Sequence, residues 1–239
     1  MRLLAFETAT EACSVAVWSD GELRERFELA PRRHAELALP WAEALLAEAG
    51  IAKSSLDAIA VGRGPGAFTG VRLAIAVAQG IALALDRPVV PVSTLAALAL
   101  QADGPRVLAA IDARMGEVYA AAFACEGGDA RLLDRERVVV PTEVTLPGND
   151  NDWIGVGTGF AAVESGLQAT SGTRFRRIDA NALPHAADIA RLAVQAFARG
   201  EIVAPEFAEP AYLRDNVALT LVEQQAARAR KAVGKGGNG

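Results

Sequence analysis

The sequence repeats part of itself at an offset of 105 residues. Residues 3–18, LLAFETATEACSVAVW, align with residues 108–123, LAAIDARMGEVYAAAF. Each segment is an apolar run that ends in a carboxylate, Glu7 or Asp112, followed by a turn and a second apolar run. A second likeness comes in the same order, because AVGRG at residues 60–64 is similar to GVGTG at residues 155–159. Two likenesses in the same order predict a chain of two duplicated lobes.

Both lobes are expected to combine strands and helices. Strands are predicted at residues 3–6, 14–18, 22–28, 58–61, 87–92, 138–140 and 153–156. Helices are predicted at residues 34–49, starting or bending at Pro40, at 71–85, after the cap Ser93, and at 185–199. QADGPR, Gln101–Arg106, marks the boundary between the lobes. We therefore expect an N-terminal lobe of residues 1–103 and a C-terminal lobe of residues 104–239, with a flexible tail from about residue 230.

Composition gives no sign of a strongly basic, a disulfide-linked or a membrane-spanning protein. The net charge of −5 gives no long-range attraction for nucleic acid. Two cysteines, Cys13 and Cys125, form no CxxC pair and are expected to be small core residues in a reducing cytoplasm. No run of 18 apolar residues predicts a membrane span. We expect a cytoplasmic protein that does not contact a membrane.

The glycine-rich segment GRGPGAFTGVR, residues 62–72, raises the question of a nucleotide site. It lacks the lysine of a Walker loop, and it fits the dinucleotide fingerprint only loosely. As the start of a helix it could still receive a phosphate. The acids at the two strand ends would face each other across a cleft between the lobes, or else serve as strand-end caps. The candidate nucleotide or phosphate cleft comprises Glu7, Thr8, Gly64, Gly66, Asp112 and Arg114.

No metal site and no catalytic residue are predicted. His34 and His185 are the only histidines, and they stand far apart in the sequence. They form no HxxxH or HExxH pair, so the compact ligand set of a zinc hydrolase is missing.

The predicted helix at residues 71–85 carries small residues in two rows. Ala74, Ala78 and Ala82 form one row, and Ala76, Gly80 and Ala84 form the other, on roughly opposite faces. Rows of small residues let another backbone come close. One face can lie on the protein's own sheet, and the other then needs a partner.

Four segments together resemble one known family. LAFETATEACSVAVW, GRGPGAFTGVR, AIDARMGEVY and AEPAYLRDN look like the TsaB family, also called YeaZ, and they are spread from residue 4 to residue 216. The resemblance implies the duplicated two-lobe α/β fold of the actin-like class, which includes sugar kinases and heat-shock ATPases. The family is related to TsaD and has been grouped with glycoprotease-like sequences. Many relatives carry Asp where Glu7 stands, so the longer side chain is a departure.

The resemblance also implies a function. The family helps to install threonylcarbamoyl on the adenosine beside the anticodon, in tRNAs that read codons beginning with A. Its members pair with the catalytic subunit TsaD, and the ATPase TsaE joins them. ATP and a metal ion are used by those partners, tRNA is met through the complex, and no cofactor is expected in the isolated chain. TsaD carries a metal-binding HxxxH that this sequence lacks, which favours a non-catalytic subunit.

The resemblance implies that the first two helices of the N-terminal lobe contact TsaD, as they do in relatives. The same face could also pair two copies of the chain. The expected interface residues are Leu37, Trp41, Leu45, Thr69, Arg72, Ile75, Ala78 and Ala82. Two other functions remain open: an actin-like ATPase or phosphotransferase, and a glycoprotease-like peptidase. Turnover by the lone chain would distinguish them.

Overall fold

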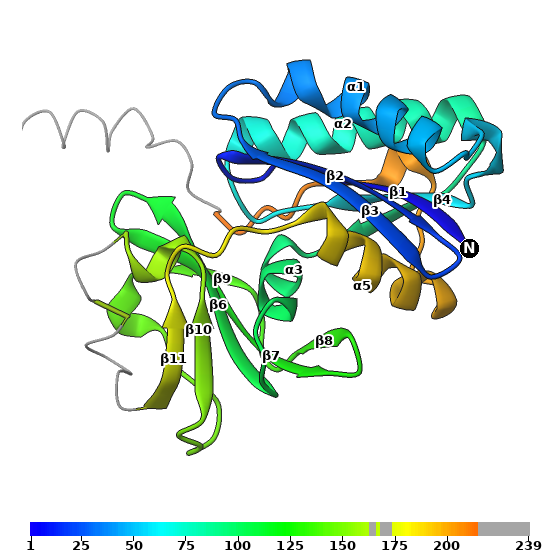
Figure 1. The fold of residues 1–239 in the computed structure, drawn as a ribbon. Helices are drawn as coiled ribbons and strands as arrows, with labels where there is room; N and C mark the ends of the chain where they lie inside the picture. Colours follow the sequence, from blue (N-terminus) through cyan, green and yellow to red (C-terminus); the bar gives the residue numbers. More distant parts are fainter. Residues whose placement is uncertain (163–165, 168–173, 215–239) are drawn as a thin grey trace, which may run out of the picture.

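The computed structural model describes residues 1–162, 166–167 and 174–214, which form two β-sheets with helices around and between them (Figure 1). The first sheet has the strand order β3-β2-β1-β4-β5. Its strands are β1 (Arg2–Glu7), β2 (Ala12–Ser19), β3 (Glu22–Leu29), β4 (Ala58–Gly62) and β5 (Val89–Val92). The three strands β1 to β3 run antiparallel, while β4 and β5 continue the sheet parallel to β1.

The second sheet repeats this arrangement. Its order is β11-β10-β6-β7-β8, and β9 also pairs with β7. Its strands are β6 (Arg106–Arg114), β7 (Glu117–Glu126), β8 (Asp129–Leu132), β9 (Arg137–Val139), β10 (Trp153–Val156) and β11 (Phe175–Asp179). An antiparallel hairpin, β6–β7, again has a parallel strand, β10, on the other side of its first member. The duplication predicted from the two sequence likenesses is confirmed.

The helices divide the molecule into layers. They are α1 (His34–Glu48), α2 (Phe68–Leu85), α3 (Thr94–Leu100) and α5 (Ala186–Ala198), with short 3-10 turns at Lys53–Ser55, Pro141–Glu143, Thr158–Phe160 and Pro205–Phe207. Helices α1 and α2 cover one face of the first sheet, and α5 covers the other (Figure 1). Helix α3 contacts α5 and the second sheet. A strand between two covered faces must be apolar on both sides, which explains the unbroken apolar runs of β1 and β6.

Helix α5 ties the two halves of the sequence together. It follows the second sheet in the chain, yet it packs on β1, β2, β4 and β5. Its N-terminus is fixed by Glu25, whose carboxylate accepts hydrogen bonds from Ser14 Oγ at 2.7 Å and from the Ala187 amide at 3.0 Å. The other carboxylate oxygen lies 3.0 Å from His185 Nδ1. A division between residues 103 and 104 therefore separates the two sheets, while α5 from the second part of the sequence packs on the first sheet.

Several elements differ from the expectation. Helix α1 runs without a break through Pro40, and the strand expected at residues 87–92 begins only at Val89. The delay follows from Asp86, which ends α2 with a left-handed residue at φ 52°. Strands β8 and β11 were not predicted. The tail expected from residue 230 lies outside the described residues.

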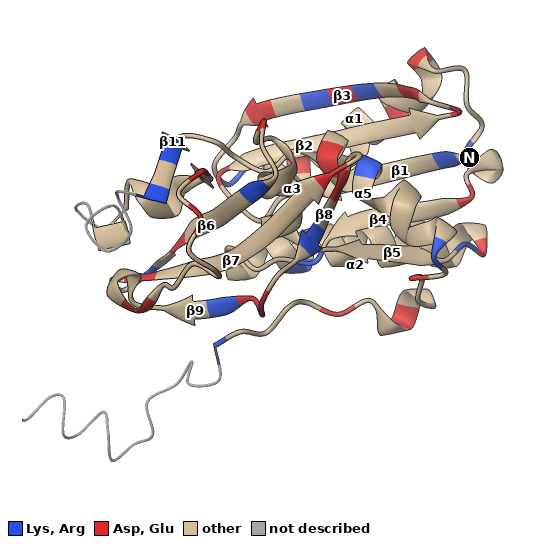
Figure 2. Cartoon of the chain, turned by 90° about the horizontal axis from the view of Figure 1, so that it is seen from below, with Lys and Arg blue, Asp and Glu red and all other residues tan. Residues whose placement is uncertain are grey.

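Strand β3 forms one edge of the first sheet. Glu22, Arg24, Glu25, Arg26 and Glu28 place both signs of charge along it, as Figure 2 shows. Charged side chains along an edge strand oppose pairing with a strand of another chain.

Candidate functional site

The glycine loop, residues 62–70, packs tightly on the turn that follows β1. A Cβ atom at Gly66 would lie 2.4 Å from the carbonyl oxygen of Ala9. A Cβ atom at Gly70 would lie 2.0 Å from the carbonyl oxygen of Thr8, and the Thr8 hydroxyl donates to the Gly70 carbonyl at 2.7 Å. The absence of side chains is thus required by contacts within the chain, and these glycines close the loop over the turn.

Glu7 lies beneath this loop, in the core. Only 1% of the residue is exposed. Its Oε1 accepts a hydrogen bond from the Ala9 amide at 2.6 Å, and its Oε2 accepts one from the Thr94 hydroxyl at 2.8 Å. Gly62 provides the space, since a Cβ atom there would lie 2.0 Å from Glu7 Oε2. Burial raises the pKa of Glu7 to about 7, although these hydrogen bonds oppose the rise.

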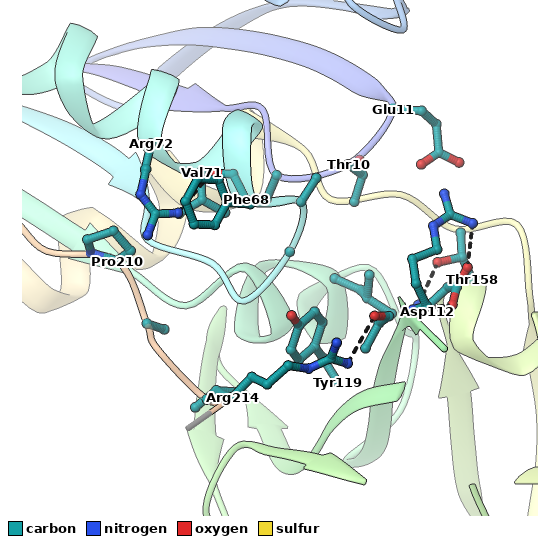
Figure 3. A pocket seen from close by; sticks show the side chains of 18 of the residues that line it. Thr10, Glu11, Phe68, Val71, Arg72, Asp112, Tyr119, Thr158, Pro210 and Arg214 are labelled. Atoms are coloured by element: carbon teal, nitrogen blue, oxygen red, sulfur yellow. Dashed lines mark hydrogen bonds and ion pairs between the residues drawn. The ribbon is translucent and has the colours of Figure 1, made fainter. Parts of the chain in front are cut away.

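An open cleft of about 1020 Å³ lies between the two lobes (Figure 3). Its walls come from the turn after β1, the start of α2, the β6–β7 turn and the segment 210–214. Of the six predicted cleft residues, Gly66, Asp112 and Arg114 line it. Glu7, Thr8 and Gly64 are buried and do not line it. The prediction was wrong for these three because the glycine loop covers the β1 turn, whereas the β6–β7 turn is open.

The second-lobe acid has a polar environment. Asp112 accepts a hydrogen bond from the Arg114 amide at 2.8 Å and pairs with the Arg114 guanidinium at 2.7 Å. The Asp112 amide donates to the Thr158 hydroxyl at 3.2 Å. Arg114 and the next residue, Met115, both have positive φ, and the Met115 side chain is exposed at the tip of the turn. Equivalent acids of the two lobes therefore have different roles: one is a core residue and the other faces the cleft.

The opposite wall of the cleft is aromatic and basic. The guanidinium carbon of Arg72 lies 3.3 Å from the centre of the Phe68 ring and 5.1 Å from that of Tyr212. Arg72 also donates to the Phe68 carbonyl at 3.1 Å and to the Tyr212 hydroxyl at 2.9 Å. Arg214 approaches Tyr119 from below in Figure 3 and pairs with Glu117 at 2.5 Å. Segment 210–214 thus crosses from one lobe to the other along the cleft.

Sequence reasoning missed part of this wall. The segment AEPAYLRDN supported the family resemblance, but neither Tyr212 nor Arg214 within it was predicted to line a site. Phe68, Tyr119 and Thr158 were missed as well. Nothing near them in the sequence marks them, because the cleft forms only when distant segments meet.

The predicted interface residues divide into two groups. Leu45, Ile75, Ala78 and Ala82 are buried in the core under the first sheet, so they cannot meet a partner. Leu37 and Trp41 are half-buried, Thr69 is exposed, and Arg72 faces the cleft. The error was one of face: the row containing Ala78 lies on the chain's own sheet.

The other row of α2 faces outward. Ala76, Gly80 and Ala84 are exposed, and Leu83 beside them is 62% exposed. Within the part of the chain that the structure describes, one helix, α2, is both long enough and apolar enough to cross a membrane, judged by length and composition alone. Its inner row packs on the first sheet, as in the core helix of a soluble protein, which passes the same test. Among the described residues, nothing lies within 4 Å of a Cβ atom placed at Gly80, in the middle of the outer row.

Histidine and carboxylate groups are dispersed. Across residues 1–162, 166–167 and 174–214, no group of three or more His, Cys, Asp and Glu side chains could hold a metal ion. His34 Nε2 lies 3.0 Å from the Thr10 carbonyl and 3.2 Å from the Ala12 carbonyl. Since both are acceptors, Nε2 carries the proton and fixes α1 to the turn after β1.

Comparison with known proteins gives consistent matches over most of the chain. Residues 27–221 match the family model of TsaD, tRNA N6-adenosine threonylcarbamoyltransferase. The tRNA threonylcarbamoyladenosine biosynthesis protein TsaB of Escherichia coli is 45% identical over 91% of this chain and 96% of its own length. Its counterpart from Haemophilus influenzae is 38% identical over 91% and 95%. The solved structure of YeaZ from Pseudomonas aeruginosa is 50% identical, with a TM-score of 0.83 over 89% of this chain and 99% of that one.

Proposed function

The chain belongs to the TsaB (YeaZ) family, and we propose that it serves tRNA threonylcarbamoyladenosine biosynthesis as a non-catalytic subunit that binds a TsaD-type catalytic subunit. It has the duplicated actin-like fold of that family. In this proposal a TsaE-type ATPase joins the pair, and the partners use the ATP and the metal ion. The chain meets tRNA as part of the assembled complex.

The observation that carries the proposal is Gly80. Glycine in the middle of a helix costs about 1 kcal/mol relative to alanine. At Gly62, Gly66 and Gly70 the chain's own atoms exclude a side chain, but nothing lies within 4 Å of a Cβ atom placed at Gly80. No described contact therefore explains why this position lacks a side chain. A backbone that approaches from outside, across the row Ala76, Gly80 and Ala84, supplies the reason.

The surroundings of Gly80 support a protein contact. Leu83 exposes apolar area on α2, and Leu39 on the neighbouring helix α1 is 48% exposed. Exposed apolar side chains and a glycine on the outer side of a helix permit a second helix to pack closely, and exposed apolar surface is unfavourable in water. The same surface could pair with a second copy of the chain when the partner is absent.

Two substitutions at Gly80 test the contact. Gly80→Ala should raise the stability of the lone chain by about 1 kcal/mol, because helix propensity improves and the added methyl meets no atom. It should also weaken the complex with TsaD, because overpacking a close contact costs about 1–3 kcal/mol. Gly80→Arg should abolish the complex. Urea unfolding and size-exclusion chromatography with purified TsaD give the two readouts.

The matched control is Ala198→Arg, which adds the same side chain at an exposed position on α5, across the first sheet from α2. It should bind TsaD as the unchanged chain does. Normal heterodimers with both Gly80 variants would show that this surface is not the interface.

Reconstitution tests the function itself. TsaD, TsaE, ATP, a divalent metal ion, threonylcarbamoyl-adenylate and tRNA are incubated with and without this chain, and the digested tRNA is assayed for the modified nucleoside. Modification should require the chain. The chain alone with tRNA and the adenylate should give none, and product in proportion to the lone chain would contradict a non-catalytic role.

A further inference from the structure

We propose that the cleft between the lobes binds an unpaired segment of RNA. This inference rests on the proposed function, since it names the surface by which the chain would meet its tRNA. The first observation is charge. The chain as a whole carries −5, but four arginines against two carboxylates line the cleft. They are Arg32, Arg72, Arg114 and Arg214, with Glu11 and Asp112.

Two of these arginines keep their charge uncompensated. Arg72 donates only to neutral oxygens, those of Phe68 and Tyr212. Arg32 is exposed, and it has no hydrogen bond or ion pair to any residue in the described ranges. Arg114 and Arg214, by contrast, are paired with carboxylates. Among the described residues, two unpaired arginines against one unpaired carboxylate, Glu11, leave the lining with a small positive surplus in an acidic protein, which attracts phosphate groups to this place.

The second observation is an open stacking surface. Arg72 covers one face of the Phe68 ring at 3.3 Å, yet 67% of Phe68 remains exposed. Most of Phe68 therefore remains accessible in the cleft. Tyr212, on the same wall, is 63% exposed. A base can stack on such a ring, and arginines beside it can meet the flanking phosphates, which is how proteins hold single strands.

The third observation concerns the acceptors. Asp112, Glu11 and the hydroxyls of Tyr119 and Thr158 lie along the cleft (Figure 3). Carboxylates repel a triphosphate, but they accept hydrogen bonds from amino groups of bases and from ribose 2′-hydroxyls. The volume of about 1020 Å³ is at the upper end of the usual range of small-ligand pockets, about 300–1,000 Å³, and the cleft is open, so a strand could extend beyond it. These features favour an RNA strand over a free nucleotide.

The test uses the full chain without any partner, and fluorescence anisotropy of a fluorescein-labelled heptaadenylate RNA. We expect a dissociation constant on the order of 10 µM at low salt. Phe68→Leu should weaken binding about tenfold through loss of stacking. Phe207→Leu is the matched control, because Phe207 is 68% exposed and does not line the cleft. Both variants keep residues 215–239, so the basic residues there contribute equally.

Charge is tested by salt dependence. Arg32→Gln should reduce the slope of log Kd against log salt by about 0.7, the value for one phosphate contact on a single strand. Arg131→Gln removes the same charge from β8, which pairs with the end of β7 farthest from the cleft, and should leave the slope unchanged. Equal weakening by the two phenylalanine variants, or equal slopes for the two arginine variants, would overturn the proposal. Displacement of the RNA by micromolar ADP would overturn it in favour of a free nucleotide.

These outcomes are separate from those of the proposed function. A chain that binds RNA in the cleft but fails to pair with TsaD contradicts only the subunit role. If the chain supports modification but its RNA binding does not depend on Phe68, only the assignment of the RNA site to the cleft is contradicted. Urea unfolding of each variant verifies that the loss of binding is not a loss of fold.

Discussion

The substitution Glu7→Gln should remove a pH dependence from the stability of the fold. Glu7 is buried, and its pKa is raised from 4.5 to about 7. A glutamine has nearly the same shape and cannot ionise. Its oxygen can accept from the Ala9 amide, and its amide group can donate to the Thr94 hydroxyl oxygen, which already accepts from the Gly64 amide at 3.2 Å.

The sign follows from proton binding. Between pH 4.5 and about 7 the folded chain holds a proton on Glu7 that the unfolded chain has lost, so the free energy of unfolding falls as pH rises. A difference of about 2.5 in pKa corresponds to about 3 kcal/mol in total. Between pH 5 and pH 8 most of this is lost, about 2–3 kcal/mol. The glutamine variant should match the unchanged chain near pH 5 and exceed it by that amount at pH 8.

Urea unfolding at pH 5, 6, 7 and 8 measures the difference, with tryptophan fluorescence as the signal. His185 also contributes a fall with pH, because its bond to Glu25 raises the pKa of the imidazole. That contribution is present in both proteins and cancels in the difference. Glu22→Gln at the exposed start of β3 is the control, and it should behave as the unchanged chain. A difference between the Glu7 variant and the parent that stays constant from pH 5 to pH 8 would refute the reasoning.

Two further predictions concern Gly62, which lies beside Glu7, and His185, which lies beside Glu25. Gly62→Ala should destabilise the fold by about 1–3 kcal/mol, because the new Cβ would lie 2.0 Å from Glu7 Oε2, and the shorter acid of Glu7→Asp should recover at least about 1 kcal/mol in the double variant. Additive urea midpoints would contradict this coupling. His185→Gln should lower stability more at pH 6 than at pH 9, since stabilisation by the charged imidazole is present below the unfolded pKa of about 6.5 and is lost as pH rises through the raised folded pKa. A loss that does not change with pH would exclude the charged pair with Glu25.

The architecture could be predicted because its signals are local. The hairpin at Asp20-Gly21, the apolar runs of β1 and β4 and the alanine-rich length of α2 each depend on residues close in sequence. The position of α5 could not be predicted in this way. Its amphipathic pattern shows that one face is buried, but it does not show that the first sheet covers it.

The same limit applies to the choice of face on α2. The two rows of small residues were visible in the sequence, and periodicity placed them on opposite sides. Which row rests on the sheet depends on the rotation of the helix, and that is set by the packing of Val71, Ala74 and Ile75 in the core. A choice between two nearly equivalent rows therefore needed the structure.

Comparison of the two strand-end acids explains why the cleft has its present character. Gly62, Gly66 and Gly70 bring the glycine loop onto the first turn, so Glu7 is withdrawn into the core and stabilises it. Asp112, at the equivalent place in the second lobe, faces the cleft, and its carboxylate forms an ion pair with Arg114. A pair of facing carboxylates, the arrangement expected from the repeat, is thus not formed. The uncompensated positive charge that faces the cleft comes instead from Arg32, in the loop before α1, and from Arg72 of α2, which agrees with the proposed contact to a polyanion.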